Sequence, residues 1–351
     1  MKQEIIFRCD GSAEIGLGHV MRCLSLADGL KREGFTTITF VSKDYERKIL
    51  DKIRGHHFQL EIISPMADLD QDLAHLLAKF RMSRGTIVIT DSYKIDAHYI
   101  EELKNSGALV ISIDDLAEIH FASDVVVNQN IYAFEMEYSV APYTTLLLGP
   151  QYALLQKECI DKREVKHLKK KNGYSLLVTM GGSDPANQTQ NVVDALNGLD
   201  EKIRNKVVVH VLVGSGYLSQ QVCFLASHEK NIPLEIHYDP ANLYQLMAQA
   251  DVAVSAGGST CYELAYLGVP TLIISQADNQ KKIAEKMDEE GVSICLGYCD
   301  SVEGEEIKNA VIALITDEEK RERMSKRGQK LIDGQGVKRV VKEIKTLIQN
   351  S

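Results

Sequence analysis

The sequence predicts two α/β domains, each built on a doubly wound parallel sheet, which face each other across a cleft. Three observations support this fold class. The chain has 351 residues, which exceeds one ordinary hydrophobic core and fits two domains. Short apolar runs alternate with amphipathic stretches in both halves, a rhythm typical of a parallel sheet covered by helices. A basic, polar segment at residues 157–173 interrupts this rhythm and is the expected linker.

The first domain is expected over residues 1–156. Its apolar runs predict strands, and the amphipathic stretches between them predict helices. The expected strands lie near residues 4–9, 36–41, 86–90, 109–113 and 125–127, and the expected helices lie near residues 19–32, 70–82 and 97–105.

The second domain is expected over residues 174–334 and repeats the same rhythm. Its strands are predicted near residues 174–180, 206–213, 234–238, 252–256, 271–275 and 293–297, each followed by a helical pattern. Charged amphipathic helices follow from Val302. The residues 333–336 break them before a last helix at 337–348. We expect the terminal segment 335–351 to pack back toward the first domain.

Composition excludes several classes of protein. The apolar fraction of 44% and the charged fraction of 25% are typical of a globular chain, and no apolar run is long enough to span a bilayer. No export signal is visible, so a cytoplasmic protein without membrane insertion is expected. The net charge of −9 opposes binding to nucleic acid. The seven cysteines are scattered without a C-x-x-C pair, which predicts reduced thiols and neither a disulfide framework nor a zinc site. The oligomeric state stays open.

The strongest candidate for chemistry lies at the first strand. This strand runs into a glycine turn at Gly16 and Gly18, and the turn delivers His19 to the start of a helix. Backbone N–H groups and an imidazole would then meet at one ligand. A dinucleotide fingerprint would need a third glycine where Met21 stands, so this alternative is weak. A lone histidine could also serve only as a helix cap.

Two further glycine turns follow strands of the second half. The first turn contains Gly182 and Ser183, and backbone N–H groups there suit an anion. An ordinary helix cap by Asp184 is the structural alternative. The second turn contains Gly258, Ser259 and Thr260, where hydroxyls and N–H groups suit a diphosphate. Glu263 follows one helical turn later and suits ribose hydroxyls, although it could also be a surface glutamate.

Other polar residues follow neighbouring strands and would face the same crevice. They are Asp91 to Tyr93, Asp114, Asp115, Asn128, Asn130, Tyr132 and the loop 275–280 with Asn279. The acidic run 68–72 imitates a metal motif of sugar transferases, but it precedes a helix, so helix-start acids are the favoured explanation. Metallopeptidase, NTPase and esterase motifs do not occur. The sequence therefore predicts a sugar-nucleotide reaction without metal or cofactor.

The motifs together resemble a known family. They are Arg8-x-Asp10-x-Ser12-x-x-Ile15-Gly16-x-Gly18-His19-x-x-Arg22, Asp114-Asp115, Asn128-x-Asn130-x-Tyr132-Ala133, Tyr152-Ala153-Leu154, Met180-Gly181-Gly182-Ser183-Asp184-x-x-Asn187 and the segment 257–270. This set is similar to the UDP-2,4-diacetamido-2,4,6-trideoxy-beta-L-altropyranose hydrolases of pseudaminic acid biosynthesis, up to about Gly297. The segment 257–270 is shared more widely with two-domain glycosyltransferases, including the peptidoglycan transferase that makes lipid II.

The resemblance implies a glycosyltransferase-B fold with two Rossmann-like domains and water as the acceptor of a UDP-activated sugar. It implies that His19 is the general base and that Tyr93 lies at the sugar. It further implies that Asn187 and Glu263 hold the nucleotide and that Asn279 lies on the substrate side. The remaining expected substrate-binding residues are Gly16, Gly18, Arg22, Gly182, Ser183, Gly258, Ser259 and Thr260.

The expected reaction is attack of water at the anomeric carbon with inversion, cleavage of the C–O bond and release of UDP. The helix start beside His19 would disfavour the imidazolium and keep the ring neutral. Two alternatives stay open. In a UDP-sugar transferase the same histidine would activate an acceptor hydroxyl, and a nucleotide-sugar binding protein would need no base at all. The exact sugar and the final glycan also stay open.

Overall fold

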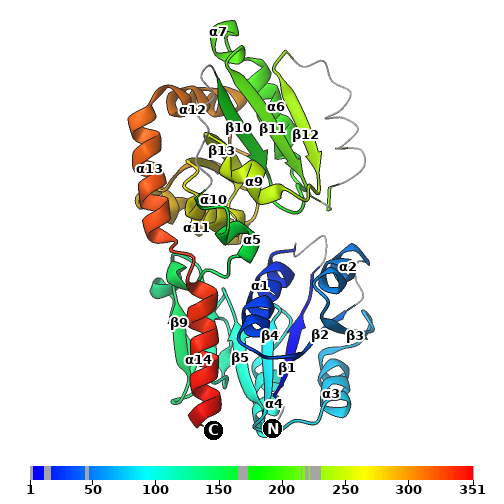
Figure 1. Ribbon diagram of the computed structural model, residues 1–351. Coiled ribbons are helices and arrows are strands. Elements are labelled where there is room, and N and C mark those ends of the chain that lie inside the picture. Colours follow the sequence, from blue (N-terminus) through cyan, green and yellow to red (C-terminus); the bar gives the residue numbers. More distant parts are fainter. Residues whose placement is uncertain are drawn as a thin grey trace. The chain divides into compact units, whose positions relative to one another are not determined.

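The computed structural model describes residues 3–11, 17–43, 47–164, 173–214, 216–217, 221 and 231–350. The chain divides into two compact units (Figure 1). Unit 1 comprises Met1–Gln156 and Gly334–Ser351, and unit 2 comprises Lys157–Asp333. Of the segment 157–173, Lys157–Ile160 form the short helix α5, whereas residues 165–172 lie outside the described part of the chain.

Unit 1 contains a seven-stranded parallel sheet in the order β3-β2-β1-β4-β5-β7-β9. Its strands are β1 (Glu4–Cys9), β2 (Thr37–Lys43), β3 (Gln59–Ile63), β4 (Thr86–Asp91), β5 (Leu109–Ile113), β7 (Val125–Asn128) and β9 (Thr145–Leu148). The short strands β6 (His120–Phe121) and β8 (Ser139–Val140) pair separately. The helices are α1 (Gly18–Arg32), α2 (Arg47–Gly55), α3 (Leu69–Lys79), α4 (Ala97–Asn105) and α14 (Gly336–Asn350), with short 3-10 turns η1 (Ala133–Glu135) and η2 (Pro150–Tyr152).

Alternation along the strands builds two cores in unit 1, one on each face of the sheet. In β1, Ile5 and Phe7 join a core that α1 and α14 cover, with Leu24 and Val337 among its members. Ile6 between them points to the opposite core, to which α3 and α4 contribute. The sheet is therefore wound on both faces, and α14 packs against α1 (Figure 1).

Unit 2 contains a six-stranded parallel sheet in the order β12-β11-β10-β13-β14-β15. Its strands are β10 (Tyr174–Thr179), β11 (Val207–Val213), β12 (Leu234–Tyr238), β13 (Val252–Ala256), β14 (Thr271–Ser275) and β15 (Ser293–Tyr298). Its longer helices are α6 (Gln188–Asn197), α10 (Thr260–Leu267), α11 (Asp278–Glu289), α12 (Gly304–Thr316) and α13 (Glu318–Leu331). Two short helices, α7 (Glu201–Arg204) and α9 (Leu243–Ala248), are also present. The side chains of α6 and α12 pack with β10 and β11 in one core.

The order of the strands explains where ligands are expected. In unit 1 the strand order reverses between β1 and β4, and in unit 2 it reverses between β10 and β13. Ligands of open parallel sheets bind beyond the carboxyl ends of the strands at such a reversal. The turn that leads to His19 follows β1, and the two glycine turns of unit 2 follow β10 and β13.

Every strand predicted from the sequence is present within two residues of its expected ends. The prediction was wrong in omitting β3, β6, β8, β9 and α2, and in extending the helix near 70–82, which ends at Lys79. Phe80 adopts an extended conformation with φ −114° and is buried, which stops that helix. Among the described residues, no helix has the length and apolar character needed to cross a membrane.

Candidate functional site

His19 lies in the first turn of α1 and is nearly buried, with 5% of its surface exposed. Its Nδ1 atom is 2.5 Å from Oδ1 of Asp91, the last residue of β4. The two residues meet because β1 and β4 are neighbours in register, so that Cys9 pairs with Asp91 and the turn after β1 begins beside it. Sequence reasoning placed Asp91 only on the wall of the crevice and missed its contact with His19.

Arg22, one turn beyond His19 on α1, holds the same carboxylate with two hydrogen bonds. Its Nε donates to Oδ2 and its Nη2 to Oδ1 of Asp91, each at 2.6 Å. Burial alone would raise the pKa of Asp91, but the charges of Arg22 and His19 outweigh it and lower the pKa to about 2. Asp91 is therefore ionised at neutral pH and accepts the Nδ1 proton of His19.

This arrangement fixes the tautomer of His19. Because Nδ1 carries the proton that points at Asp91, the lone pair of the neutral ring is on Nε2, as a general base requires. The Arg22 Nη2 atom, 3.1 Å from Nδ1, then faces an N–H and makes no hydrogen bond there. Chemically, the pair can take a proton from water or a hydroxyl at Nε2.

Tyr93 contacts His19, and Asp115 contacts both Tyr93 and Arg22. The Tyr93 ring lies edge-on to the His19 ring, with centroids 4.6 Å apart, and 41% of Tyr93 is exposed. The Tyr93 hydroxyl donates to Oδ2 of Asp115 at 3.1 Å, and Arg22 reaches the same oxygen at 3.4 Å. Gly18 is the first residue of α1, whereas Gly16 lies outside the described residues.

A second group of buried charges lies at the end of β1. Arg8 donates from Nε and Nη2 to Asp72 on α3, and its Nη1 lies 2.7 Å from Asp10. Asp10, at the end of β1, also accepts the backbone N–H of Lys43. In the acidic run 68–72, Asp68 caps α3, as predicted, while Asp72 neutralises Arg8. These charges anchor the end of β1 and therefore the start of the turn that carries His19.

The polar residues after β5 and β7 form a local network. Asp114 accepts the N–H groups of Leu116 and Ala117 and the Tyr138 hydroxyl, which in turn accepts a hydrogen bond from Asn128. Asn130 donates to the Tyr132 hydroxyl. A cavity of about 50 Å³ beside this network is lined by residues that include Ser92, Tyr93 and Asp114.

The first glycine turn of unit 2 follows β10. Gly181 has φ +79°, which favours glycine, and the carbonyl of Gly182 accepts the N–H of Gly216 at 2.9 Å. Asp184 accepts the N–H groups of Gln188 and Thr189, the first two residues of α6, and so fills the capping role that the sequence left open as an alternative. Gly182 and Ser183 are half-buried beside this cap. Asn187 has the left-handed φ of +51° immediately before α6.

The second glycine turn follows β13 and leads into α10. Ser259 occupies the N-cap position, but its side chain makes no capping hydrogen bond, so the hydroxyl stays available to a ligand. The N–H groups of Cys261 and Tyr262 already donate to the carbonyls of Gly258 and Ser259, so the donors left for a ligand at this turn lie before Cys261. A side chain at Gly258 would meet no atom within 4 Å, so the backbone is open to close approach. Because β10 and β13 are paired, the two turns lie at one edge of this sheet.

Glu263 is half-buried in the first turn of α10. It accepts the hydroxyl of Tyr244 at 2.7 Å, and burial raises its pKa to about 7. No cation contacts its carboxylate in the part of unit 2 that the structure describes. Asn279 is exposed in the first turn of α11. Within unit 2 the predicted residues therefore cluster at the ends of β10, β13 and β14.

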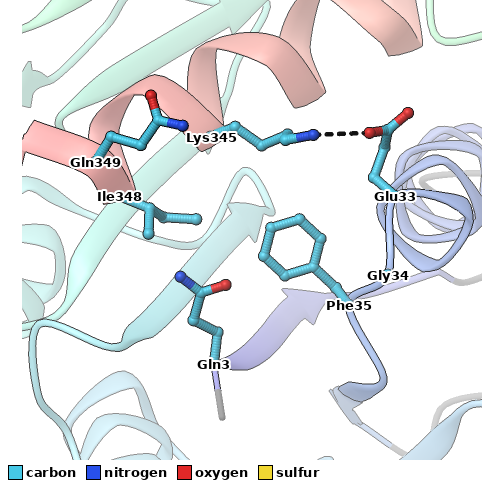
Figure 2. A pocket seen from close by; sticks show the side chains of 7 residues that line it. All are labelled: Gln3, Glu33, Gly34, Phe35, Lys345, Ile348 and Gln349. Atoms are coloured by element: carbon cyan, nitrogen blue, oxygen red, sulfur yellow. Dashed lines mark hydrogen bonds and ion pairs between the residues drawn. The ribbon is translucent and has the colours of Figure 1, made fainter. Parts of the chain in front are cut away.

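A larger pocket of about 260 Å³ lies at the other end of the unit 1 sheet (Figure 2). Gln3, which precedes β1, and Phe35, which precedes β2, line it, together with Ile348 and Gln349 of α14. Its two charged side chains, Lys345 and Glu33, bind each other at 2.8 Å. It thus lies at the amino ends of the strands and offers no unpaired charge for chemistry.

Comparisons with known proteins agree with the fold. Residues 176–344 match the glycosyltransferase family 28 C-terminal domain. The chain is 27% identical to the spore coat polysaccharide biosynthesis protein SpsG of Bacillus subtilis over 342 residues, 97% of each chain. It is 23% identical to the UDP-2,4-diacetamido-2,4,6-trideoxy-beta-L-altropyranose hydrolase of Campylobacter jejuni over 84% of this chain and 100% of that one.

The structure is similar to the crystal structure of MurG from Acinetobacter baumannii, with a TM-score of 0.68, 12% identity, and coverage of 99% of this chain and 100% of that one. The predicted glycosyltransferase-B fold, two Rossmann-like α/β domains, is thereby confirmed.

Proposed function

We propose that this protein hydrolyses a UDP-activated sugar, UDP-2,4-diacetamido-2,4,6-trideoxy-beta-L-altropyranose, to UDP and the free sugar without a metal. The observation that carries the proposal is the His19–Asp91 pair, which leaves the Nε2 lone pair of His19 for a proton of water. The hydrolase of Campylobacter jejuni, similar over its full length, supports the choice of substrate.

Each unit has one part of the proposed reaction. The turns at Gly182–Ser183 and Gly258–Thr260 bind the diphosphate through backbone N–H groups, and Glu263 accepts ribose hydroxyls. His19 Nε2 removes a proton from water, whose oxygen attacks the anomeric carbon. The bond from that carbon to the diphosphate oxygen breaks, and its electrons leave with UDP. Tyr93 and Arg22 line the sugar side. The attack inverts the anomeric centre, and a positioned base of this kind contributes roughly 10²–10⁴-fold to the rate.

The test follows the reaction by ¹H and ³¹P NMR in H₂¹⁸O, with the full chain, no metal and no acceptor. Wild type is expected to release UDP and free sugar, with ¹⁸O in the sugar, and His19→Ala is expected to be slower by roughly 10²–10⁴-fold. His98→Ala is the matched control, because His98 is exposed on α4 of the same unit. It should retain the wild-type rate.

Three results would overturn the proposal. Isotope in UDP would mean attack at phosphorus. Turnover only after an acceptor is added would mean a UDP-sugar transferase, which the match to the family 28 domain also supports. Binding of UDP-sugar without turnover in either condition would mean a binding protein.

A further inference from the structure

Three side chains with metal-binding chemistry converge on the strands β11 and β12, away from the glycine turns. His210 on β11 pairs in register with Glu235 on β12. His237 lies two residues beyond Glu235 and therefore on the same face of the sheet. His210 Nδ1 is 3.1 Å from His237 Nε2 and 3.3 Å from Glu235 Oε2, and the last two atoms are 3.8 Å apart. Register alone brings the three together.

These distances match a metal site. A circle through the three atoms has a radius of about 2 Å, which is the length of zinc–nitrogen and zinc–carboxylate bonds in proteins. Two imidazoles and one carboxylate are also a donor set that zinc accepts, with water in the fourth position. The histidine side chains are 13% and 22% exposed and that of Glu235 is 59% exposed, so an ion can enter from solvent.

We propose that His210, Glu235 and His237 bind one zinc ion. The ion would join β12, the edge strand of the unit 2 sheet, to its neighbour β11. These residues have no part in the proposed hydrolysis, so the zinc site can be present whether or not the protein is a hydrolase. The competing explanation is a hydrogen-bonded cluster in which one histidine donates to the other and the carboxylate orients them.

The experiment uses the full chain, stripped of metal with a chelator that is then removed. Cobalt(II) serves as a spectroscopic probe, zinc competition gives the affinity, and elemental analysis gives the stoichiometry. We expect one equivalent of cobalt with the visible bands of four-coordinate geometry and no thiolate charge-transfer band. Zinc should also raise the melting temperature, because it binds only the folded site.

The variants His237→Ala and Glu235→Gln test the ligands, and His98→Ala is the control. Removal of a ligand should weaken the affinity for zinc by at least the roughly 10–100-fold that is typical when an outer-shell partner is removed. The control variant should bind zinc with the affinity of wild type. Circular dichroism of the metal-free variants checks that they fold. The proposal is overturned if no stoichiometric binding occurs, if a thiolate band appears, or if folded His237→Ala binds zinc as wild type does.

Discussion

Two carboxylates, one beside each candidate site, have pKa values that are shifted in opposite directions. Asp91 of unit 1 contacts Arg22 and His19, and its pKa falls to about 2. Glu263 of unit 2 contacts only the Tyr244 hydroxyl among its described partners, and burial raises its pKa to about 7. The two sites therefore differ in the charge that they hold at neutral pH. Unit 1 places fixed charges around His19, whereas unit 2 has two glycine turns and a carboxyl group whose charge depends on pH.

The largest expected effect on stability is at Asp91. The change Asp91→Asn keeps the shape of the side chain but leaves the buried Arg22 without its nearest counter-charge, which should cost about 3–5 kcal/mol of unfolding free energy. The loss should shrink as the pH falls from about 4 toward 2, because wild-type Asp91 is then protonated as well. Urea unfolding at several pH values measures both quantities.

Asp115→Asn is the control for this prediction. Asp115 also contacts Arg22, but at 3.4 Å and through one nitrogen, so its loss should cost less than the loss of Asp91. Equal losses in the two variants would mean that Asp91 is not the main partner of Arg22.

A smaller effect of opposite sign is expected at Glu263. Its pKa is about 7 in the folded chain against 4.5 without the fold, so the folded state favours the protonated form. This contribution is fully present below about pH 4.5 and is lost as the pH rises through about 7, for a total of about 3 kcal/mol. The Glu263→Gln variant has no titratable group at this position, so it does not lose this stability as the pH rises. The unfolding free energy of the variant relative to wild type should therefore rise over that range, and a flat difference would contradict the raised pKa.

The smallest effect is expected at Gly258. A methyl group there meets no protein atom within 4 Å, so Gly258→Ala should leave the melting temperature nearly unchanged. It should nevertheless weaken UDP binding about tenfold, or roughly 1.4 kcal/mol, if the diphosphate approaches this backbone. Calorimetric titration with UDP measures the affinity. Gly55→Ala, which also meets no atom, is the control, and equal affinities in both variants would remove the diphosphate from this turn.

The sequence predicted the parallel strands of both sheets well, because strands buried on two faces read as continuous apolar runs. It missed β3 and β9, the edge strands of the unit 1 sheet. Their patterns are mixed, since Ile62 of β3 and Leu146 of β9 are 39% and 38% exposed. An exposed apolar residue breaks the regular alternation of apolar and polar residues by which a strand is recognised in a sequence, so these two strands were not predicted.

Candidate residues that belong to one local motif were predicted, but the residues that contact them from other strands were not. His19 and Arg22 are recognisable from one helix start, whereas Asp91 lies 72 residues away from His19 and meets it only through the pairing of β1 with β4. His210 and Glu235 likewise meet through strand register. Such contacts depend on the order of strands in the sheet, which no local spacing reports.

The position of α14 in the sequence affects the order in which the two units can fold during synthesis. Val337, Val340 and Ile344 belong to the same core as β1 and α1, although the whole of unit 2 separates them in sequence. Unit 2 is one continuous stretch and can fold as soon as it leaves the ribosome. The core of unit 1, in contrast, stays incomplete until α14 has been synthesised, because α14 covers α1 on one side. A chain truncated after Asp333 would therefore have the whole of unit 2 but would lack the helix that completes the core of unit 1.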